Sequence, residues 1–263
     1  MILAVDIANT YITVGCIDRR KIYFWERITT VIGKPNLEYA ITLKSILEIY
    51  HINLSSIEGA IVSSVVPPLN RTISEAIRKI TGIRAQFVGS GMKTGLNIRM
   101  DNPRGVGSDM IATAVGALEM HRPPLIIIDM STAVSFSVID AESSYIGGCL
   151  MPGIRISLEA LSANTAQLPK ISLEAPRQVI GKNTVVSMQS GIVYGYASMF
   201  DGMIERIEAE LGESASIIAT GGLMKLVLPH LRHEVAFDET LILKGLLTLY
   251  ERNRPLPGKM HRS

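Results

Sequence analysis

The sequence predicts an α/β protein built from two related halves, each with a mixed sheet flanked by helices. One pattern occurs twice, at residues 4–18 and 127–140: an apolar strand ends in an Asp, a turn of small and hydroxyl residues follows, and a second β-branched strand closes on another Asp. In each half the predicted strands precede the predicted helices. A carboxylate delivered into a turn rich in hydroxyl and N–H groups can hold a metal–phosphate group. The repeat therefore indicates two half-domains that face each other across a nucleotide.

The composition is that of a compact folded protein without a nucleic-acid partner. The chain has 263 residues, 47% of them hydrophobic and 19% charged, which is enough for one large or two modest domains. A net charge of +2 gives no electrostatic basis for nucleic-acid binding. The basic cluster near the C-terminus is typical of a solvated end; it comprises Arg252, Arg254, Lys259 and Arg262.

The cysteine count and the hydropathy pattern predict a cytoplasmic protein. The two cysteines, Cys16 and Cys149, argue against a disulfide scaffold and fit a reducing compartment. The chain opens directly on a predicted strand, without a charged-then-apolar leader. No apolar run reaches the ~18 residues of a membrane span, so no membrane partner is expected.

The elements of the first half follow from apolar periodicity and from Gly and Pro punctuation. Ser108 is expected to cap the last helix of this half, and Gly82 to end the helix before it. We expect a hairpin over 2–17, strands at 22–27, 59–66 and 84–88, helices at 37–50, 69–81 and 109–120, and an irregular loop at 89–107.

The second half is expected to begin after His121, which predicts domains at 1–121 and 122–263 and a sheet of the five-stranded type in each. Thr184 is the expected N-cap of a long helix. We expect strands at 125–129, 133–139, 145–150 and 216–220, helices at 154–163, 185–211 and 241–250, a loop at 164–183, and a short helix after Gly221-Gly222.

Three aspartates are candidate site residues, and each also has a purely structural explanation. Asp6 and Asp129 end the repeated apolar strands, although an Asp can also stabilise its own turn. Asp109 follows Gly107-Ser108 at the start of a helix, where an acidic residue also complements the helix dipole. Thr132, after Asp129, is equally typical of a strand start.

Six segments occur in an order that resembles the type III pantothenate kinase family of the sugar kinase/Hsp70/actin superfamily. They are residues 6–10, 101–109, 129–133, 147–153, 181–184 and 219–222. The resemblance implies two actin-like domains with a nucleotide cleft between them. It also implies an ATP-dependent enzyme that converts pantothenate to 4′-phosphopantothenate, at the start of coenzyme A synthesis.

The resemblance assigns roles to individual residues. Asp109 matches the general base that takes the proton of the acceptor hydroxyl. Asp129 matches the site of a monovalent cation, potassium or ammonium, and Mg²⁺ is expected to accompany ATP. The expected ATP-binding residues are Asp6, Ile7, Ala8, Asn9, Thr10, Tyr11, Ile12, Thr13, Thr132, Gly221 and Gly222. The expected acceptor-binding residues are Met100, Gly107, Ser108, Asp109, Met110 and Thr184.

Four positions depart from the family pattern. Met110 stands where the family has Arg and Met100 where it has Tyr, while Ala8 and Ser131 replace glycines. Two alternatives therefore stay open beside the pantothenate kinase: a non-catalytic or regulatory nucleotide-binding protein, and a kinase of a different small alcohol. Arg99 and Arg104 are candidate replacements for the missing cation.

The long helix predicts a homodimer or simple burial between two layers of one domain. Its apolar residues form a stripe broader than one core-facing side needs. They are Met188, Ile192, Val193, Tyr196, Met199, Phe200 and Met203. Resemblance to a dimeric family favours the homodimer, with Thr184 near the acceptor site of the neighbour. The histidines have no metal-site spacing, with His230 and His233 expected on the surface, and no Ser or Cys nucleophile is indicated.

Overall fold

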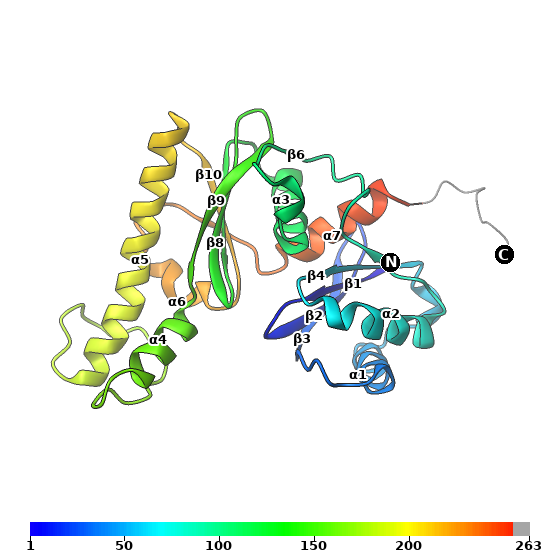
Figure 1. Ribbon diagram of the computed structural model, residues 1–263, viewed down its shortest axis with the longest axis horizontal. Coiled ribbons are helices and arrows are strands. Elements are labelled where there is room, and N and C mark those ends of the chain that lie inside the picture. Colours follow the sequence, from blue (N-terminus) through cyan, green and yellow to red (C-terminus); the bar gives the residue numbers. More distant parts are fainter. Residues whose placement is uncertain (255–263) are drawn as a thin grey trace. The chain divides into compact units, whose positions relative to one another are not determined.

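A computed structural model describes residues 1–254, which form two compact units (Figure 1). Of the described residues, the first unit contains 1–96, 101–120 and 240–254, and the second contains 97–100 and 121–239. The predicted division after His121 is therefore wrong for the last helix, which belongs to the first unit. Of the basic cluster, Lys259 and Arg262 lie outside the described residues.

The first unit has the predicted five-stranded mixed sheet, in the order β3-β2-β1-β4-β5. Strands β1 and β2 form an antiparallel hairpin, β3 pairs with β2, and β1, β4 and β5 run parallel. Because side chains alternate along β1, Val5 points to one face of the sheet and Asp6 to the other. The bounds are Ile2–Ile7, Tyr11–Ile17, Ile22–Thr29, Gly59–Ser64 and Gln86–Phe87 for β1 to β5.

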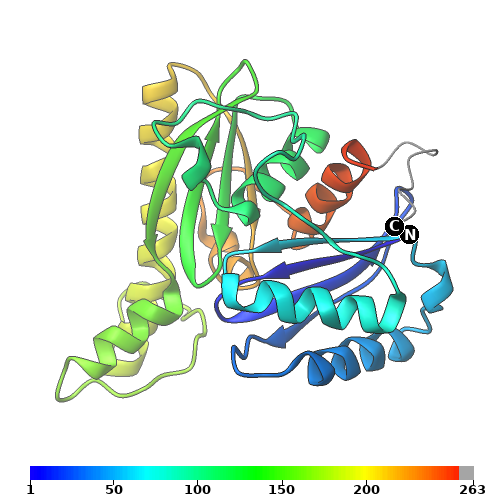
Figure 2. The same cartoon turned by 45° about the vertical axis from the view of Figure 1, so that its right-hand side comes forward.

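Two helices cover each face of this sheet. Helices α1 (Asn36–Ile49) and α2 (Pro67–Thr81) pack on the face of Val5, side by side in Figure 2. Helix α2 begins two residues earlier than predicted, because a proline at the first helical position needs no N–H partner. Helices α3 (Ser108–Met120) and α7 (Leu241–Arg252) cover the opposite face, which contains Asp6.

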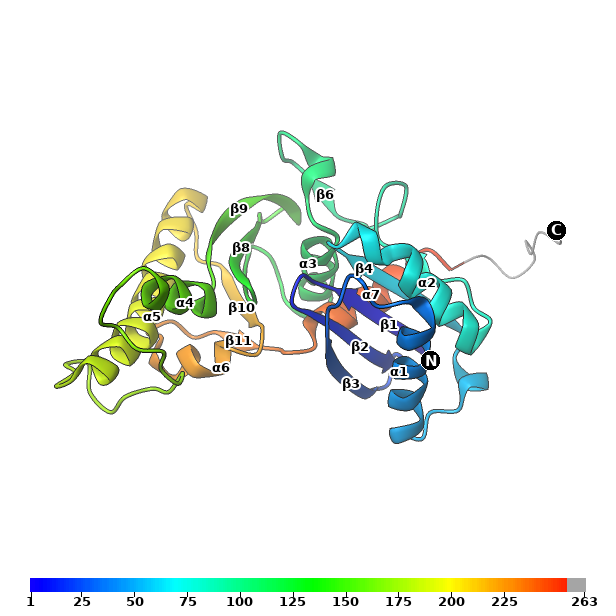
Figure 3. The ribbon, with the colours of Figure 1, turned by 60° about the horizontal axis from the view of Figure 1, so that its bottom comes forward.

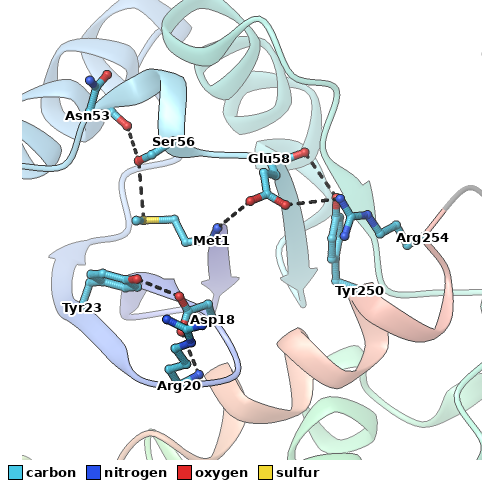
Figure 4. Close-up of polar contacts among 9 residues, drawn as sticks. All are labelled: Met1, Asp18, Arg20, Tyr23, Asn53, Ser56, Glu58, Tyr250 and Arg254. Atoms are coloured by element: carbon cyan, nitrogen blue, oxygen red, sulfur yellow. Dashed lines mark hydrogen bonds and ion pairs between the residues drawn. The ribbon is translucent and has the colours of Figure 1, made fainter. Parts of the chain in front are cut away.

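Contacts around Glu58 attach the end of α7 to the first unit (Figure 4). The Tyr250 hydroxyl donates to the Glu58 backbone carbonyl at 3.4 Å. Arg254 and the amino group of Met1 bind the Glu58 carboxylate at 3.2 and 3.3 Å. At Gly59 a Cβ atom would lie 2.0 Å from the Tyr250 hydroxyl, so this strand start requires glycine. The last helix thus completes the first unit.

The second unit repeats the strand order of the first. Its sheet runs β11-β10-β7-β8-β9-β6, so that β7, β8, β9 and β10 correspond to β1, β2, β3 and β4. The sheet has six strands instead of the predicted five-stranded type, since the two-residue strands β6 (Asn97–Ile98) and β11 (Ala236–Phe237) are too short to leave a pattern in the sequence. The others are β7 Leu125–Met130, β8 Ala133–Ile139, β9 Ser144–Pro152 and β10 Ser216–Thr220.

The long helix α5 (Thr184–Leu211) packs on this sheet together with α4 (Ile154–Ala163) and α6 (Met224–Val227) (Figure 3). Most of its predicted apolar stripe is buried in the core of the same unit, with Phe200 against Phe136. Burial within one unit therefore accounts for the stripe. Asn183, not Thr184, is the N-cap, because its side chain accepts from the Val186 N–H at 3.0 Å.

Short 3-10 helices complete the secondary structure at Leu54–Ser56, Pro103–Gly105 and Leu228–His230. Within residues 1–254, no helix combines the length and apolar character needed to traverse a bilayer.

Candidate active site

The β1–β2 turn of the first unit is compact and closed by backbone hydrogen bonds. The Ala8 N–H donates to the Tyr11 carbonyl at 3.1 Å, and Thr30 on the β3 side donates its hydroxyl to the Ala8 carbonyl at 2.7 Å. Asn9 and Thr10 are exposed at the tip. Among the described residues the non-glycine positions with positive φ are His51 and Ser143, so alanine at position 8 carries no backbone strain.

The residues of the turn differ in accessibility, which separates those able to meet a ligand from those that hold the strand. Tyr11 is 42% exposed and Thr13 half-buried, whereas Ile7 and Ile12 are fully buried. A phosphate group at this turn would therefore meet hydroxyl, amide and N–H groups, while the apolar residues anchor the hairpin in the core.

Asp6 lies on the sheet face that α3 covers. It is 8% exposed and pairs with Ser63 of β4 in the parallel register. Ser63 lies two residues after Ile61, which packs with α3 residues, so its side chain points to the same face. The structure thus brings the end of β1 and the start of α3 to the carboxyl edge of one sheet.

Asp109 occupies the first turn of α3 and is half-buried. Its Oδ1 accepts from the Met110 N–H at 2.8 Å, and a Cβ at Gly107 would come within 2.3 Å of that oxygen. Gly107 therefore permits the carboxylate to fold over the helix start. The other oxygen, Oδ2, forms no hydrogen bond with the described residues and can accept a proton from a substrate.

Ser108 does not cap α3 as predicted. The helix already begins at this residue, and its hydroxyl contacts β4 instead. Ser108 Oγ lies 2.9 Å from the Ser64 nitrogen, 3.0 Å from the Ser64 carbonyl oxygen and 3.1 Å from the Ser63 hydroxyl.

The β7–β8 turn is the counterpart in the second unit. Asp129 lies at the end of β7, in register with Thr220 of the parallel strand β10. In the turn, Ser131 donates both its N–H and its hydroxyl to the Ala133 carbonyl, at 3.0 and 3.3 Å. Thr132 is exposed beside it.

Two glycines pack directly against the backbone around this turn. Gly221 has φ of 93°, and a Cβ there would lie 2.2 Å from the Met130 carbonyl oxygen. A Cβ at Gly153 would lie 2.3 Å from the Thr132 carbonyl oxygen. The second unit thus brings Asp129, Thr132 and Gly221 to the same turn. Gly153, in the segment 147–153, packs there as well, although the sequence assigns it no individual role.

Thr184 lines a cavity of about 740 Å³ in the second unit. The cavity is lined by the segment before α5 and by apolar residues of α4, of the loop and of α5, among them Leu161, Leu168 and Met188.

Met100, also in the second unit, is 38% exposed, whereas Met110 belongs to the first unit and is half-buried.

The cysteines are unsuited to nucleophilic chemistry. Burial raises the pKa of the Cys16 thiol to about 12 and also raises the pKa of Cys149, so neither forms a thiolate readily.

His233 is not a simple surface residue as predicted. Its Nδ1 lies 2.7 Å from Oδ1 of the buried Asp201 in α5. Burial would raise the pKa of Asp201, but hydrogen bonds from His233 and Arg232 outweigh it and hold the pKa below its usual value. No spacing in the sequence points to this cluster, because Asp201 and His233 come from separate elements. His230 packs edge-on against the Tyr194 ring, with centroids 4.8 Å apart.

Comparison with known proteins identifies the family. The family model for type III pantothenate kinase matches residues 2–206. A type III pantothenate kinase of Myxococcus xanthus is 40% identical over 253 residues, covering 96% of this chain and 99% of the relative. One from an Exiguobacterium strain is 42% identical over 254 residues, covering 97% and 100%.

Solved structures agree in fold. The activator of the 2-hydroxyisocaproyl-CoA dehydratase from Clostridium difficile, solved with bound ADPNP, has a TM-score of 0.53 at 12% identity, covering 95% of this chain and 94% of that one. At this identity the likeness concerns the fold alone. The family model and the full-length relatives carry the assignment: the chain belongs to the type III pantothenate kinase family.

Proposed function

We propose that this chain transfers the γ-phosphoryl group of ATP to pantothenate and so forms 4′-phosphopantothenate at the start of coenzyme A synthesis. Family membership over nearly the whole chain supports the reaction class. The observation that carries the proposal is the position of Asp109, at the start of the helix that covers the Asp6 face of the first sheet.

Asp109 acts as the general base. The acceptor hydroxyl loses its proton as it attacks the γ-phosphorus, and a carboxylate within hydrogen-bond reach can take that proton. The Oδ2 atom is available for this purpose because Oδ1 is held by the Met110 N–H. A general base of this kind contributes typically ~10²–10⁴-fold to a rate.

The proposed ATP contacts lie on the hairpin turn of each unit, taken by itself. In this proposal the first turn, residues 6–13, and Thr132 meet the phosphate oxygens, and Gly221-Gly222 lies against the adenosine. Glycine at position 221 lets this segment pack directly on the Met130 backbone of the hairpin, which fixes Gly221-Gly222 beside the β7–β8 turn. Asp129 holds a monovalent cation, potassium or ammonium, and Mg²⁺ enters with ATP.

The proposed acceptor contacts are Gly107 and Met110 in the first unit and Met100 and Thr184 in the second; the contact expected at Ser108 is not retained, because its hydroxyl is bound to Ser63 and Ser64. The two methionines favour a second candidate, a kinase of a small alcohol without a carboxylate, because a thioether offers no charge-assisted hydrogen bond. Comparing pantothenate with an analogue that lacks the carboxylate separates the two candidates. Stabilisation by ATP with no effect of either acceptor would instead indicate a non-catalytic nucleotide-binding protein.

The protein acts as a cytoplasmic homodimer in this proposal, and the exposed face of α5 supports the assembly. Gly191, Gly195, Ser198 and Gly202 recur on that face at helical spacing, and a Cβ at each of the three glycines would meet nothing within 4 Å. Small residues let a second helix approach closely, and a two-fold axis pairs the same face of both copies. Light scattering at micromolar concentration is expected to give twice the 28.7 kDa chain mass.

A coupled assay of ADP release tests the function. Turnover should require ATP, potassium and pantothenate together, and Asp109→Asn should reduce kcat at least a hundredfold while the folded protein remains. Absence of turnover above background at millimolar pantothenate would overturn the proposal.

A further inference from the structure

We infer that Ser108 is a positioning residue, which fixes the start of α3 to strand β4 and thereby sets the place of the Asp109 carboxylate. The inference rests on the proposed function of Asp109 as a base. It concerns how the first unit holds that base, and it uses contacts within this unit alone.

The hydrogen bonds of Ser108 account for every donor and acceptor of its hydroxyl group. A serine hydroxyl has one proton to donate and two lone pairs that accept. Its proton goes to the Ser64 carbonyl, 3.0 Å away, and one lone pair accepts from the Ser64 N–H at 2.9 Å. The remaining lone pair must then accept from the Ser63 hydroxyl at 3.1 Å. Ser63 is therefore the donor in that pair, and Ser108 has no capacity left for a substrate.

The hydrogen bonds of Ser108 matter because β4 is the strand next to β1, which carries Asp6. Ser63 is fully buried and pairs with Asp6 in the parallel register of β1 and β4. Asp109 follows Ser108 directly, so a bond to β4 fixes the first turn of α3 against the strand adjacent to Asp6. The anchor thus joins the base to the strand pair that carries the first phosphate-binding turn.

The rest of α3 is held by packing, which does not fix its first turn. Ala112 and Val115 are buried in the core that α3 forms with the sheet and α7. Residues 105–109 are half-buried or exposed. Removing the Ser108 hydroxyl should therefore loosen the helix start and leave the core intact. A misplaced base slows the chemical step, whereas a lost binding contact weakens affinity.

Kinetics of three variants test the inference. In Ser108→Ala we expect kcat to fall about tenfold, with KM for ATP and for pantothenate within about twofold of wild type. Ser108→Thr retains the hydroxyl and should recover most of the loss. Ser63→Ala should lower kcat less than Ser108→Ala does. The double variant Ser63→Ala/Ser108→Ala should have the same kcat as Ser108→Ala, because the two hydroxyls belong to one hydrogen-bond network and their effects do not add. Ser56→Ala is the matched control, since its hydroxyl also donates to a backbone carbonyl in this unit.

Hydrogen exchange gives a readout that does not depend on the reaction. The Ser64 N–H donates to Ser108 Oγ, so Ser108→Ala should exchange faster over residues 59–66 and 106–111 and not elsewhere. A wild-type chain without turnover would overturn the proposed function, while this local loss of protection would still support the anchor. Four results would each overturn the inference. They are a wild-type kcat in Ser108→Ala, a rise in its KM without a fall in kcat, a Ser108→Thr variant as slow as Ser108→Ala, and unchanged hydrogen exchange in Ser108→Ala.

Discussion

Replacing Gly245 with alanine should destabilise the first unit, because α7 crosses α3 at a glycine pair. A Cβ at Gly245 would lie 1.7 Å from the carbonyl oxygen of Ala112 and 3.0 Å from the amide nitrogen of Gly116. Both are backbone atoms of α3, so no side chain can rotate away. Conversely, a Cβ at Gly116 would lie 2.5 Å from the carbonyl oxygen of Leu241 in α7.

The size of the effect follows from how far the helices must move. A Cβ–oxygen contact becomes ordinary at 3.4 Å and the present separation would be 1.7 Å, so α7 would have to withdraw by about 1.7 Å from a closely packed core. Overpacking of this kind costs typically ~1–3 kcal/mol and more where only backbone can yield. Alanine returns about 1 kcal/mol through its higher helix propensity. Since only backbone can yield here, we take the overpacking cost as about 4 kcal/mol, so the net loss of about 3 kcal/mol corresponds to a fall in Tm of roughly 6–12 °C.

Thermal unfolding followed by circular dichroism measures this loss. Thr248→Ala, also in α7, is the control: it raises helix propensity at a half-buried position and should leave Tm within about 2 °C of wild type. A Gly245→Ala variant with Tm equal to or above wild type would refute the close crossing of α3 and α7.

Three further predictions concern the second unit. Gly221→Ala places a methyl group at a residue with positive φ and against the Met130 carbonyl. We expect the free energy of unfolding in urea to fall by about 2–4 kcal/mol and the thermal shift with ATP to be smaller. An unchanged free energy of unfolding would contradict this prediction. Since the pKa of Asp201 is lowered in the folded state, its stabilising contribution is present above the unfolded pKa of about 3.9 and lost as pH falls through the folded value. The stability difference between wild type and Asp201→Asn should accordingly shrink as pH falls below about 4, and a difference independent of pH would count against the His233 contact. Gly195→Arg places a long charged side chain on the exposed face of α5, so light scattering should show a monomer, and a persistent dimer would locate the interface elsewhere.

The sequence predicts most of the elements and the candidate site because both depend on local patterns. The strand–turn–strand repeat around Asp6 and Asp129 is visible in consecutive residues, and the structure has both hairpins at the predicted positions. The helix that starts beside Asp109 is found from its apolar spacing.

The features that the sequence misses depend on contacts between distant segments. The apolar residues of α7 show that it is buried, but not on which sheet. The contact of Gly59 with Tyr250 of α7, and that of Gly245 in α7 with the backbone of α3, can be seen only once the fold is known. The stripe on α5 has the same ambiguity, because a helix buried between layers and a helix at a dimer interface show the same periodicity. The role of Ser108 was mistaken for a cap because a serine at a helix start usually serves its own helix.

The repeated strand order gives these details a common origin. In each unit an Asp ends the first strand of the hairpin and pairs in register with a hydroxyl residue on the parallel strand: Asp6 with Ser63, and Asp129 with Thr220. The two units differ in what surrounds this hydroxyl residue. In the first unit, the Ser63 hydroxyl belongs to the hydrogen-bond network that holds the start of α3, next to Asp109. In the second, Thr220 leads into Gly221, whose backbone packs on the hairpin. The same strand order thus places a hydroxyl residue beside the strand-end Asp in both units, and in each unit the neighbouring residues make a close packing contact: α3 with β4 in the first, and Gly221 with the hairpin in the second.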